Sequence, residues 1–177
     1  YGKDSGDVPG IPLFRLGGLI VDNVMRYHLN AKRPRPGASL DMLNAAEADR
    51  ARRFHAGFPQ YAPTPLIPLP YLASALGLGN IRVKDESRRF GLNAFKVLGA
   101  SYAMGRHLAE RLGTSIDRLT PADLCSPEVS ERLGPITFVS ATDGNHGRAV
   151  AWTAQQLGKK AVIYMPKGSD PARLENI

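Results

Sequence analysis

The chain has 177 residues, of which 43% are hydrophobic, and a formal net charge of +7. This length and composition are those of a globular protein with one core or parts of two, and they exclude fibrous and disordered chains. The basic residues are scattered, and the one dense cluster, over residues 32–35, has no aromatic residues interleaved with it. We therefore expect no nucleic-acid partner.

The single cysteine, Cys125, cannot form an internal disulfide, and no other cysteine or close histidine pair completes a metal-ligand spacing. We expect Cys125 to be a small apolar filler and the protein to hold no metal. No apolar run reaches the length of a membrane span, and no secretory signal opens the chain, so a cytoplasmic protein without a membrane partner is expected. The chain opens on Tyr1 and stops at Ile177, one turn into a predicted helix, which is typical of a piece of a longer protein.

Glycine and proline divide the first two thirds of the chain into short elements. Residues 1–39 mix them with short apolar runs and suit an irregular arm. The prolines of residues 63–70 lack ladder donors, so this segment is expected as an extended loop and not as an interior strand. In chain order we expect helices over 40–54 and 71–77, a strand over 81–84, a helix over 96–112, and one or two polar helices within 115–133 that start at Thr120-Pro121 and Ser126-Pro127.

The last third of the chain predicts a parallel β-α-β unit. Two short apolar segments, 136–140 and 161–165, are expected as buried strands, with a helix over 144–157 between them. Short joints between a strand, a helix and a strand favour a right-handed parallel crossover. Asp170-Pro171 predicts the start of a further helix.

Lys96 stands where a polar loop gives way to an apolar-periodic helix rich in small residues, which is where an enzyme places an imine-forming amine. Phe95 and Val97 flank it with apolar surface, and burial against them would favour the neutral amine that a nucleophile requires. A lone lysine at the start of a helix is more often an ordinary solvated residue. The interpretation of Lys96 as a reactive amine therefore depends on the rest of the chain.

A second motif joins the strand expected over 136–140 to the helix expected over 144–157. It reads Ser140-Ala141-Thr142-Asp143-Gly144-Asn145-His146-Gly147. Such a turn directs unpaired backbone donors and the positive end of a helix toward an anion, at the sheet edge where ligands bind. Asp143 can equally be a plain N-cap, and the glycines can be steric requirements of a tight joint. Together with a reactive amine, the turn favours an enzyme that uses pyridoxal 5'-phosphate (PLP), and it does not match a Walker or dinucleotide fingerprint.

Other charged residues near Lys96 are weaker candidates. Asp85 and Glu86 point to opposite sides of a strand, so they are not expected to form a close acid–base pair, although a loop conformation leaves this open. Arg88 and Arg89 could meet a carboxylate or a phosphate, but we expect a solvated pair.

Two spaced motifs in this order resemble those of PLP enzymes with the tryptophan synthase β-like fold. They are Pro63-Thr64-Pro65-Leu66 through Lys84-Asp85-Glu86-Ser87 to Asn93-Ala94-Phe95-Lys96, and then Asp143-Gly144-Asn145-His146-Gly147-Arg148-Ala149-Val150-Ala151-Trp152. Within that group the chain is most similar to the diaminopropionate ammonia-lyases. The resemblance implies an incomplete α/β fold of fold type II with parallel-sheet, three-layer units. Residues 1–98 would be the amino-terminal part of the large PLP domain, and residues 99–177 most of the smaller α/β domain.

The resemblance also implies roles for individual residues. Lys96 binds the cofactor covalently, and Phe95 buttresses it. Asn145, beside Gly144 in the cofactor site, hydrogen-bonds the ring hydroxyl. Asp143, where dehydratase relatives usually carry a small residue, is a second proton-transfer base that acts on the D isomer, whereas Lys96 acts on the L isomer. Two bases are needed because the isomers present their α-protons to opposite faces of the cofactor ring.

The implied reaction of the full-length protein, expected as a homodimer, converts the amino acid 2,3-diaminopropionate to pyruvate and ammonia by α,β-elimination. The alternatives are a threonine or serine dehydratase-like PLP enzyme, and a non-catalytic relative of the fold that acts as a binding module. The sequence has no run of three or more glycines for a phosphate-cradling loop and no segment that would supply a partner for the pyridine nitrogen. These 177 residues alone are therefore expected to be inactive.

Overall fold

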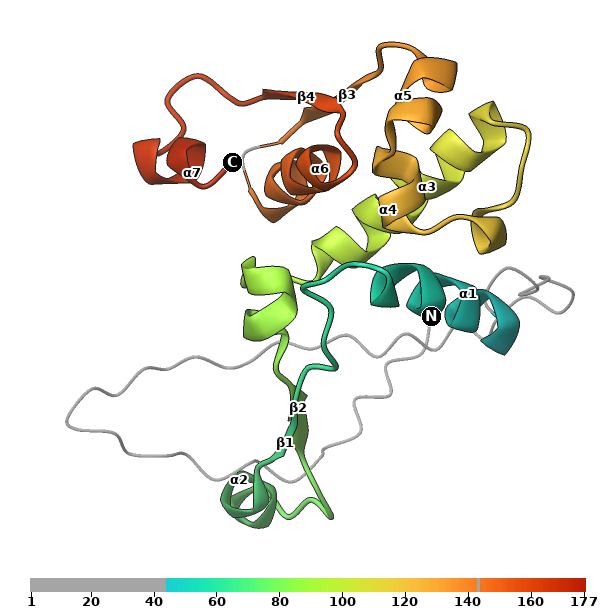
Figure 1. The fold of residues 1–177 in the computed structure, drawn as a ribbon. Coiled ribbons are helices and arrows are strands. Elements are labelled where there is room, and N and C mark those ends of the chain that lie inside the picture. The colour runs from blue at the N-terminus through green and yellow to red at the C-terminus, as the bar shows by residue number, and fades with distance from the viewer. Residues whose placement is uncertain (1–43, 143) are drawn as a thin grey trace, which may run out of the picture. The chain divides into compact units, whose positions relative to one another are not determined.

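The computed structural model describes residues 44–142 and 144–177 (Figure 1). These residues fall into two units, residues 69–81 and the rest. The shorter unit contains helix α2 (Pro70–Ala75), which agrees with the helix expected over 71–77 and is followed by Gly77 at a φ of +64°. The other unit contains α1 (Ala45–Ala56), β1 (Leu66–Pro68), β2 (Arg82–Lys84), the 3₁₀ helix η2 (Glu86–Gly91), α3 (Lys96–Arg111), the 3₁₀ helix η3 (Ile116–Arg118), α4 (Pro121–Cys125), α5 (Pro127–Leu133), β3 (Thr137–Ala141), α6 (Asn145–Gln156), β4 (Lys160–Tyr164) and α7 (Pro171–Glu175).

Side-chain caps fix where most of these helices begin. Thr120, Ser126 and Asp170 each accept a backbone N–H at the start of α4, α5 and α7, as their position before a proline predicts. Asn44 caps α1 through a 2.9 Å bond from the N–H of Glu47. The helix expected over 40–54 is confirmed as α1, although it continues to Ala56, and residues 40–43 lie outside the described residues.

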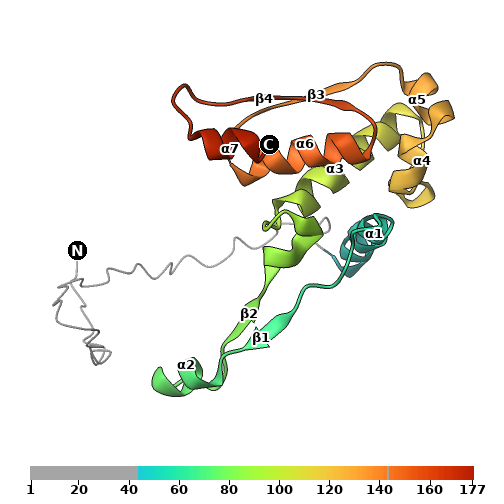
Figure 2. The ribbon, with the colours of Figure 1, turned by 60° about the vertical axis from the view of Figure 1, so that its left-hand side comes forward.

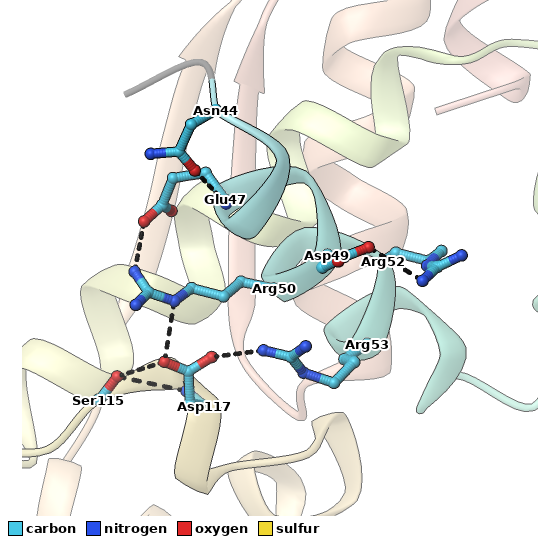
Figure 3. Close-up of polar contacts among 8 residues, drawn as sticks. All are labelled: Asn44, Glu47, Asp49, Arg50, Arg52, Arg53, Ser115 and Asp117. Atoms are coloured by element: carbon cyan, nitrogen blue, oxygen red, sulfur yellow. Dashed lines mark hydrogen bonds and ion pairs between the residues drawn. The ribbon is translucent and has the colours of Figure 1, made fainter. Parts of the chain in front are cut away.

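Charged side chains join α1 to η3 at the surface (Figure 3). Arg50 contacts Glu47 within α1 and reaches Asp117 of η3, with 3.3 Å between Nε and Oδ2. Arg53 reaches the other oxygen of Asp117 at 3.4 Å. These pairs are partly exposed, and such pairs contribute only about 0.2–1 kcal/mol each, so burial and not charge must hold α1 in place.

The segment expected as an extended loop over 63–70 contains a short strand. β1 pairs antiparallel with β2, with Leu66 opposite Lys84 and Pro68 opposite Arg82. The prediction of a loop was wrong because the prolines fit this ladder. The N–H of Asp85 donates to the carbonyl of Pro65 at 2.9 Å, so hydrogen-bonded pairs alternate from there and Pro68 falls where no donor is required.

The core of the larger unit lies where α3 packs against α1 and α6. Val97, Leu108, Leu124 and Leu157 are fully buried in it, and complete burial of such a side chain contributes about 1.5–3 kcal/mol. A Cβ on Gly105 of α3 would stand 2.6 Å from Cζ of Phe54, so a glycine is required where α1 and α3 meet.

The carboxyl-terminal third forms the expected β-α-β unit. β3 and β4 pair in parallel with Thr137 opposite Lys160, and α6 lies along the pair (Figures 1 and 2). The expectation of two buried strands was wrong. Phe138 and Ile163 pack toward the core, but Val139 and Tyr164, which alternate with them, are 62% and 65% exposed. α6 covers one face of the ladder, and the period-2 alternation of a strand exposes the other.

Three further expectations concern Cys125, metal binding and membrane spans. Cys125 is exposed, not an apolar filler, because Leu124 takes the buried position at the end of α4. The described residues contain no group of three His, Cys, Asp or Glu side chains that could hold a metal. Among their helices none combines the length and the apolar character needed to cross a membrane.

Candidate functional site

Lys96 is the first residue of α3 and is exposed. Val97 beside it is fully buried, as expected, but Phe95 is 61% exposed. The apolar surface predicted on both sides of the lysine is therefore present on one side only in the described chain. The reason is local, since a helix turns Lys96 and Phe95 away from the face that Val97 packs into the core.

The residues before Lys96 adopt an unusual backbone. Phe90 and Asn93 have φ values of 50° and 51°, and Gly91 lies between them at 72°. Asparagine and glycine tolerate this left-handed region, whereas a bulky residue such as Phe90 is rare there and strained. Phe90 is buried, with its ring centroid 5.0 Å from that of Trp152 on α6. Aromatic packing thus holds the turn that leads into Lys96.

A buried ion pair anchors the same stretch, which we define as the lysine segment, residues 84–98. Arg89 donates to both carboxylate oxygens of Glu86, at 2.8 and 2.9 Å. It also donates to Oγ1 of Thr64 at 3.0 Å and to the carbonyl of Ala62 at 3.1 Å. The bonds from Arg89 lower the pKa of Glu86 to about 2. Arg89 is therefore a buried structural residue, and the expectation that it is solvated was wrong.

Asp85 has a separate function from Glu86. Its Oδ1 accepts from the N–H and the hydroxyl of Ser87, at 3.1 and 2.6 Å, and so caps η2. These two bonds lower the pKa of Asp85. Asp85 and Glu86 therefore have different partners, in agreement with the expectation that they do not form an acid–base pair.

The second motif opens α6 at Asn145, with Gly144 at the N-cap position. Within the described residues no side chain caps this helix, and Asp143 lies outside them. Gly147 in the first turn has a steric reason. A Cβ there would stand 2.8 Å from Ile163 Cγ2 and 2.9 Å from Thr142 Cγ2. We name residues 144–148 the α6 turn.

The two motifs meet at one cavity of ≈ 460 Å³. Asn93, from the lysine segment, lines it together with Gly144, Asn145 and Arg148 of the α6 turn. Arg173, Asn176 and Ile177 of the carboxyl-terminal segment complete the lining. Lys96 begins its helix three residues after Asn93 but is not one of the lining residues. The structure thus brings predicted site residues Gly144 and Asn145 to a cavity beside the segment of Lys96, with Asn93 and Arg148 as lining residues that sequence reasoning did not single out.

This donor set fits PLP. An exposed amine on Lys96, the amide of Asn145 and the N-terminus of a twelve-residue helix are the kinds of group that an aldehyde, a ring hydroxyl and an anion require. The residue type of Asn93 could have suggested a turn before Lys96, because asparagine is enriched in left-handed turns.

Residues 58–177 match the family described as "Pyridoxal-phosphate dependent enzyme". The chain belongs to this family. Its fold is therefore the expected fold type II, of which the described helices and the small parallel sheet form an incomplete part, and its cofactor is PLP.

The chain is also similar to individual members. It is 52% identical to a diaminopropionate ammonia-lyase of Salmonella typhimurium over 156 residues, which cover 87% of this chain and 39% of that protein. It matches the crystal structure of the Escherichia coli diaminopropionate ammonia-lyase in complex with D-serine with a TM-score of 0.70 and 48% identity, over 76% of this chain and 34% of that one. A catabolic L-threonine dehydratase of Staphylococcus aureus is 33% identical over 110 residues, 62% of this chain and 25% of the relative. The chain thus spans about two fifths of the length of the first of these relatives.

Proposed function

We propose that the chain is the part of a PLP-dependent diaminopropionate ammonia-lyase that carries its reactive lysine, and that the whole protein converts 2,3-diaminopropionate to pyruvate and ammonia. The main support is its 52% identity to a protein of that name, against 33% to a threonine dehydratase, which is the rival function. A non-catalytic binding module is less favoured, since the amine, the amide and the helix N-terminus described above are all retained.

Each candidate site residue has a task in this proposal. Lys96 would hold the cofactor covalently, beside Phe95, and its amine would remove the α-proton of the substrate on one face. Asn145 and Gly144 would bind the cofactor at the N-terminus of α6, where the helix dipole and the first backbone amides favour anionic oxygens. PLP, when bound, withdraws electrons from the substrate Cα and so supplies the stabilisation that an elimination requires.

Asp143 is proposed as the base for the opposite face. A carboxylate at this position accepts the α-proton of the D isomer, which Lys96 cannot reach. The crystal structure of the E. coli relative in complex with D-serine supports a site that admits D amino acids.

The proposal extends to the setting of the enzyme. We infer a cytoplasmic homodimer that acts in amino acid catabolism on small amino acids, with no nucleic-acid or membrane partner. Residues 1–98 are assigned to the large PLP domain and residues 99–177 to the smaller domain. Gel filtration and light scattering of the full-length protein test the dimer.

The decisive test of the function uses the full-length protein. Incubation with PLP, reduction with borohydride and mass spectrometry should locate the modified residue at Lys96, and the protein should release pyruvate from diaminopropionate much faster than ketobutyrate from threonine. Lys96→Ala should lose labelling and turnover while folding normally, because a helix tolerates alanine. Label on a different lysine, or a preference for threonine, would refute the assignment.

A second test concerns Asp143. Asn keeps the size of the side chain but cannot accept a proton, and loss of a general base costs about a hundredfold to ten-thousandfold in rate. Full-length Asp143→Asn should lose activity by such a factor on D-2,3-diaminopropionate and retain a much larger fraction on the L isomer. Equal residual rates on the two pure isomers would reject this division between the two bases, and little change on either isomer would show that Asp143 is only an N-cap.

A further inference from the structure

Arg148 connects the two segments of the candidate site. It lies in the first turn of α6, is half-buried, and its Nη1 donates to the backbone carbonyl of Leu92 at 3.0 Å. Leu92 lies in the lysine segment, immediately before Asn93 and four residues before Lys96. The bond therefore spans 56 positions in sequence and joins the two motifs directly.

This bond holds the backbone next to a left-handed residue, just before α3 begins. Leu92 is buried, and Asn93 after it has a φ of 51°, so a short change of direction separates the bonded carbonyl from the start of α3. A guanidinium forms a directed hydrogen bond from a planar group, which restrains a carbonyl more than a flexible ammonium does. Arg148 also lines the cavity shared by Asn93 and Asn145.

We propose that Arg148 is a positioning residue for the reaction. It fixes the start of α3 relative to Asn145 and thereby sets the position of the Lys96 amine when the cofactor is bound. This inference rests on the proposed function, because it takes Lys96 and Asn145 as the groups that must be aligned. Misplacement of a reactive group by about 1 Å can cost a hundredfold in rate, so a single bond between the two segments can have a large kinetic effect.

The test compares full-length Arg148→Met with the wild type. Methionine keeps the apolar stem and removes every donor. In the cofactor-free protein, hydrogen exchange measured by mass spectrometry should become faster in peptides that cover residues 90–97, while peptides of α1 and α5 stay unchanged. In the PLP-loaded protein, kcat should fall by about tenfold to a hundredfold, with a smaller change in KM and a shifted absorbance of the bound cofactor.

Arg106→Met is the matched control, since it removes an exposed arginine of α3 whose ion pair with Glu110 is at 3.9 Å. It should leave exchange at residues 90–97 and kcat as in the wild type. Arg148→Lys keeps one cationic donor and should recover part of the lost rate. If the methionine variant does not fold, the lysine variant is compared with the wild type in the same two measurements.

The outcomes separate this inference from the proposed function. If Arg148→Met shows wild-type exchange at residues 90–97, the bond to Leu92 does not hold that segment. If the variant raises KM with kcat unchanged, Arg148 contacts the substrate. Either result would show that Arg148 is not a positioning residue. If instead the wild type does not turn over diaminopropionate, the proposed function fails, whereas local exchange in the cofactor-free protein still reports on the bond.

Discussion

The lysine segment and the α6 turn approach the same cavity, but they are held in different ways. The lysine segment is held by its own side chains. Arg89, paired with Glu86, donates to Ala62 and Thr64, and Phe90 packs against Trp152. The α6 turn has few side-chain bonds and is fixed by close approach, since Gly147 touches β4 and the loop after β3. Electrostatic anchoring and aromatic packing thus hold the segment that leads into α3 and Lys96, and steric fit holds the N-terminus of α6, which we propose binds the cofactor.

The largest stability effect is expected at the anchor of the lysine segment. Arg89→Met removes both guanidinium donors to Glu86, so that only the hydroxyl of Thr64 still donates to a carboxylate whose side chain is only 19% exposed. Removal of one partner of a buried pair typically destabilises by 3–5 kcal/mol, and partial exposure of Glu86 places the expected loss near the lower end, at about 3 kcal/mol. Urea denaturation of the full-length apo protein measures it.

The neighbouring residue offers the control for this prediction. Arg88 is exposed, so Arg88→Met should change the free energy of unfolding by less than about 0.5 kcal/mol. Similar losses for both arginines would mean that net charge and not the buried pair stabilises the segment.

A smaller effect is expected in the α6 turn. Gly147→Ala forces a Cβ to within 2.8 Å of Ile163 and 2.9 Å of Thr142, and such overpacking typically destabilises by about 1–3 kcal/mol. Gly99 is the opposite type of helical glycine, exposed and with no described atom within 4 Å of an added Cβ. Gly99→Ala should therefore stabilise by about 0.5–1 kcal/mol, which thermal unfolding can resolve. Loss of stability in both variants would argue against a steric basis at Gly147.

The contrast between the two regions also explains what the sequence could predict. The β-α-β unit, the helix starts before prolines, and the positions of Lys96 and Asn145 at the start of helices all follow from local patterns. The bonds from Arg89 to Ala62 and Thr64, which go with its burial, and the bond from Arg148 to Leu92 were missed because each joins residues that only tertiary folding brings together. A buried arginine has no local signature, since the same residue type is usually solvated. Likewise, alternating exposure in β3 and β4 depends on what covers each face and not on hydrophobicity.

A pH-dependent effect is expected at His55, which anchors the first turn of α3 from the side of α1. His55 is buried, and its Nε2 lies 2.9 Å from the carbonyl of Leu98 and 3.1 Å from Oγ of Ser101. Burial, reinforced by the positive charge of Arg89, lowers its pKa from the ordinary 6.5. The unfolded chain therefore binds the proton more readily than the folded chain does. The contribution of neutral His55 to stability is complete above about pH 6.5 and is lost as the pH falls below that value toward the folded-state pKa.

A variant without the imidazole isolates this contribution. His55→Gln removes the titrating group, so the free energy of unfolding of the wild type should decrease more steeply than that of the variant between about pH 7.5 and 5.5. The difference should not exceed about 1.4 kcal/mol per pH unit, the limit for one proton. Chemical denaturation of both proteins at several pH values provides the comparison. Parallel curves would contradict a neutral, buried His55, and the first turn of α3 would then be held by the Glu86–Arg89 pair and aromatic packing without a pH-sensitive contact.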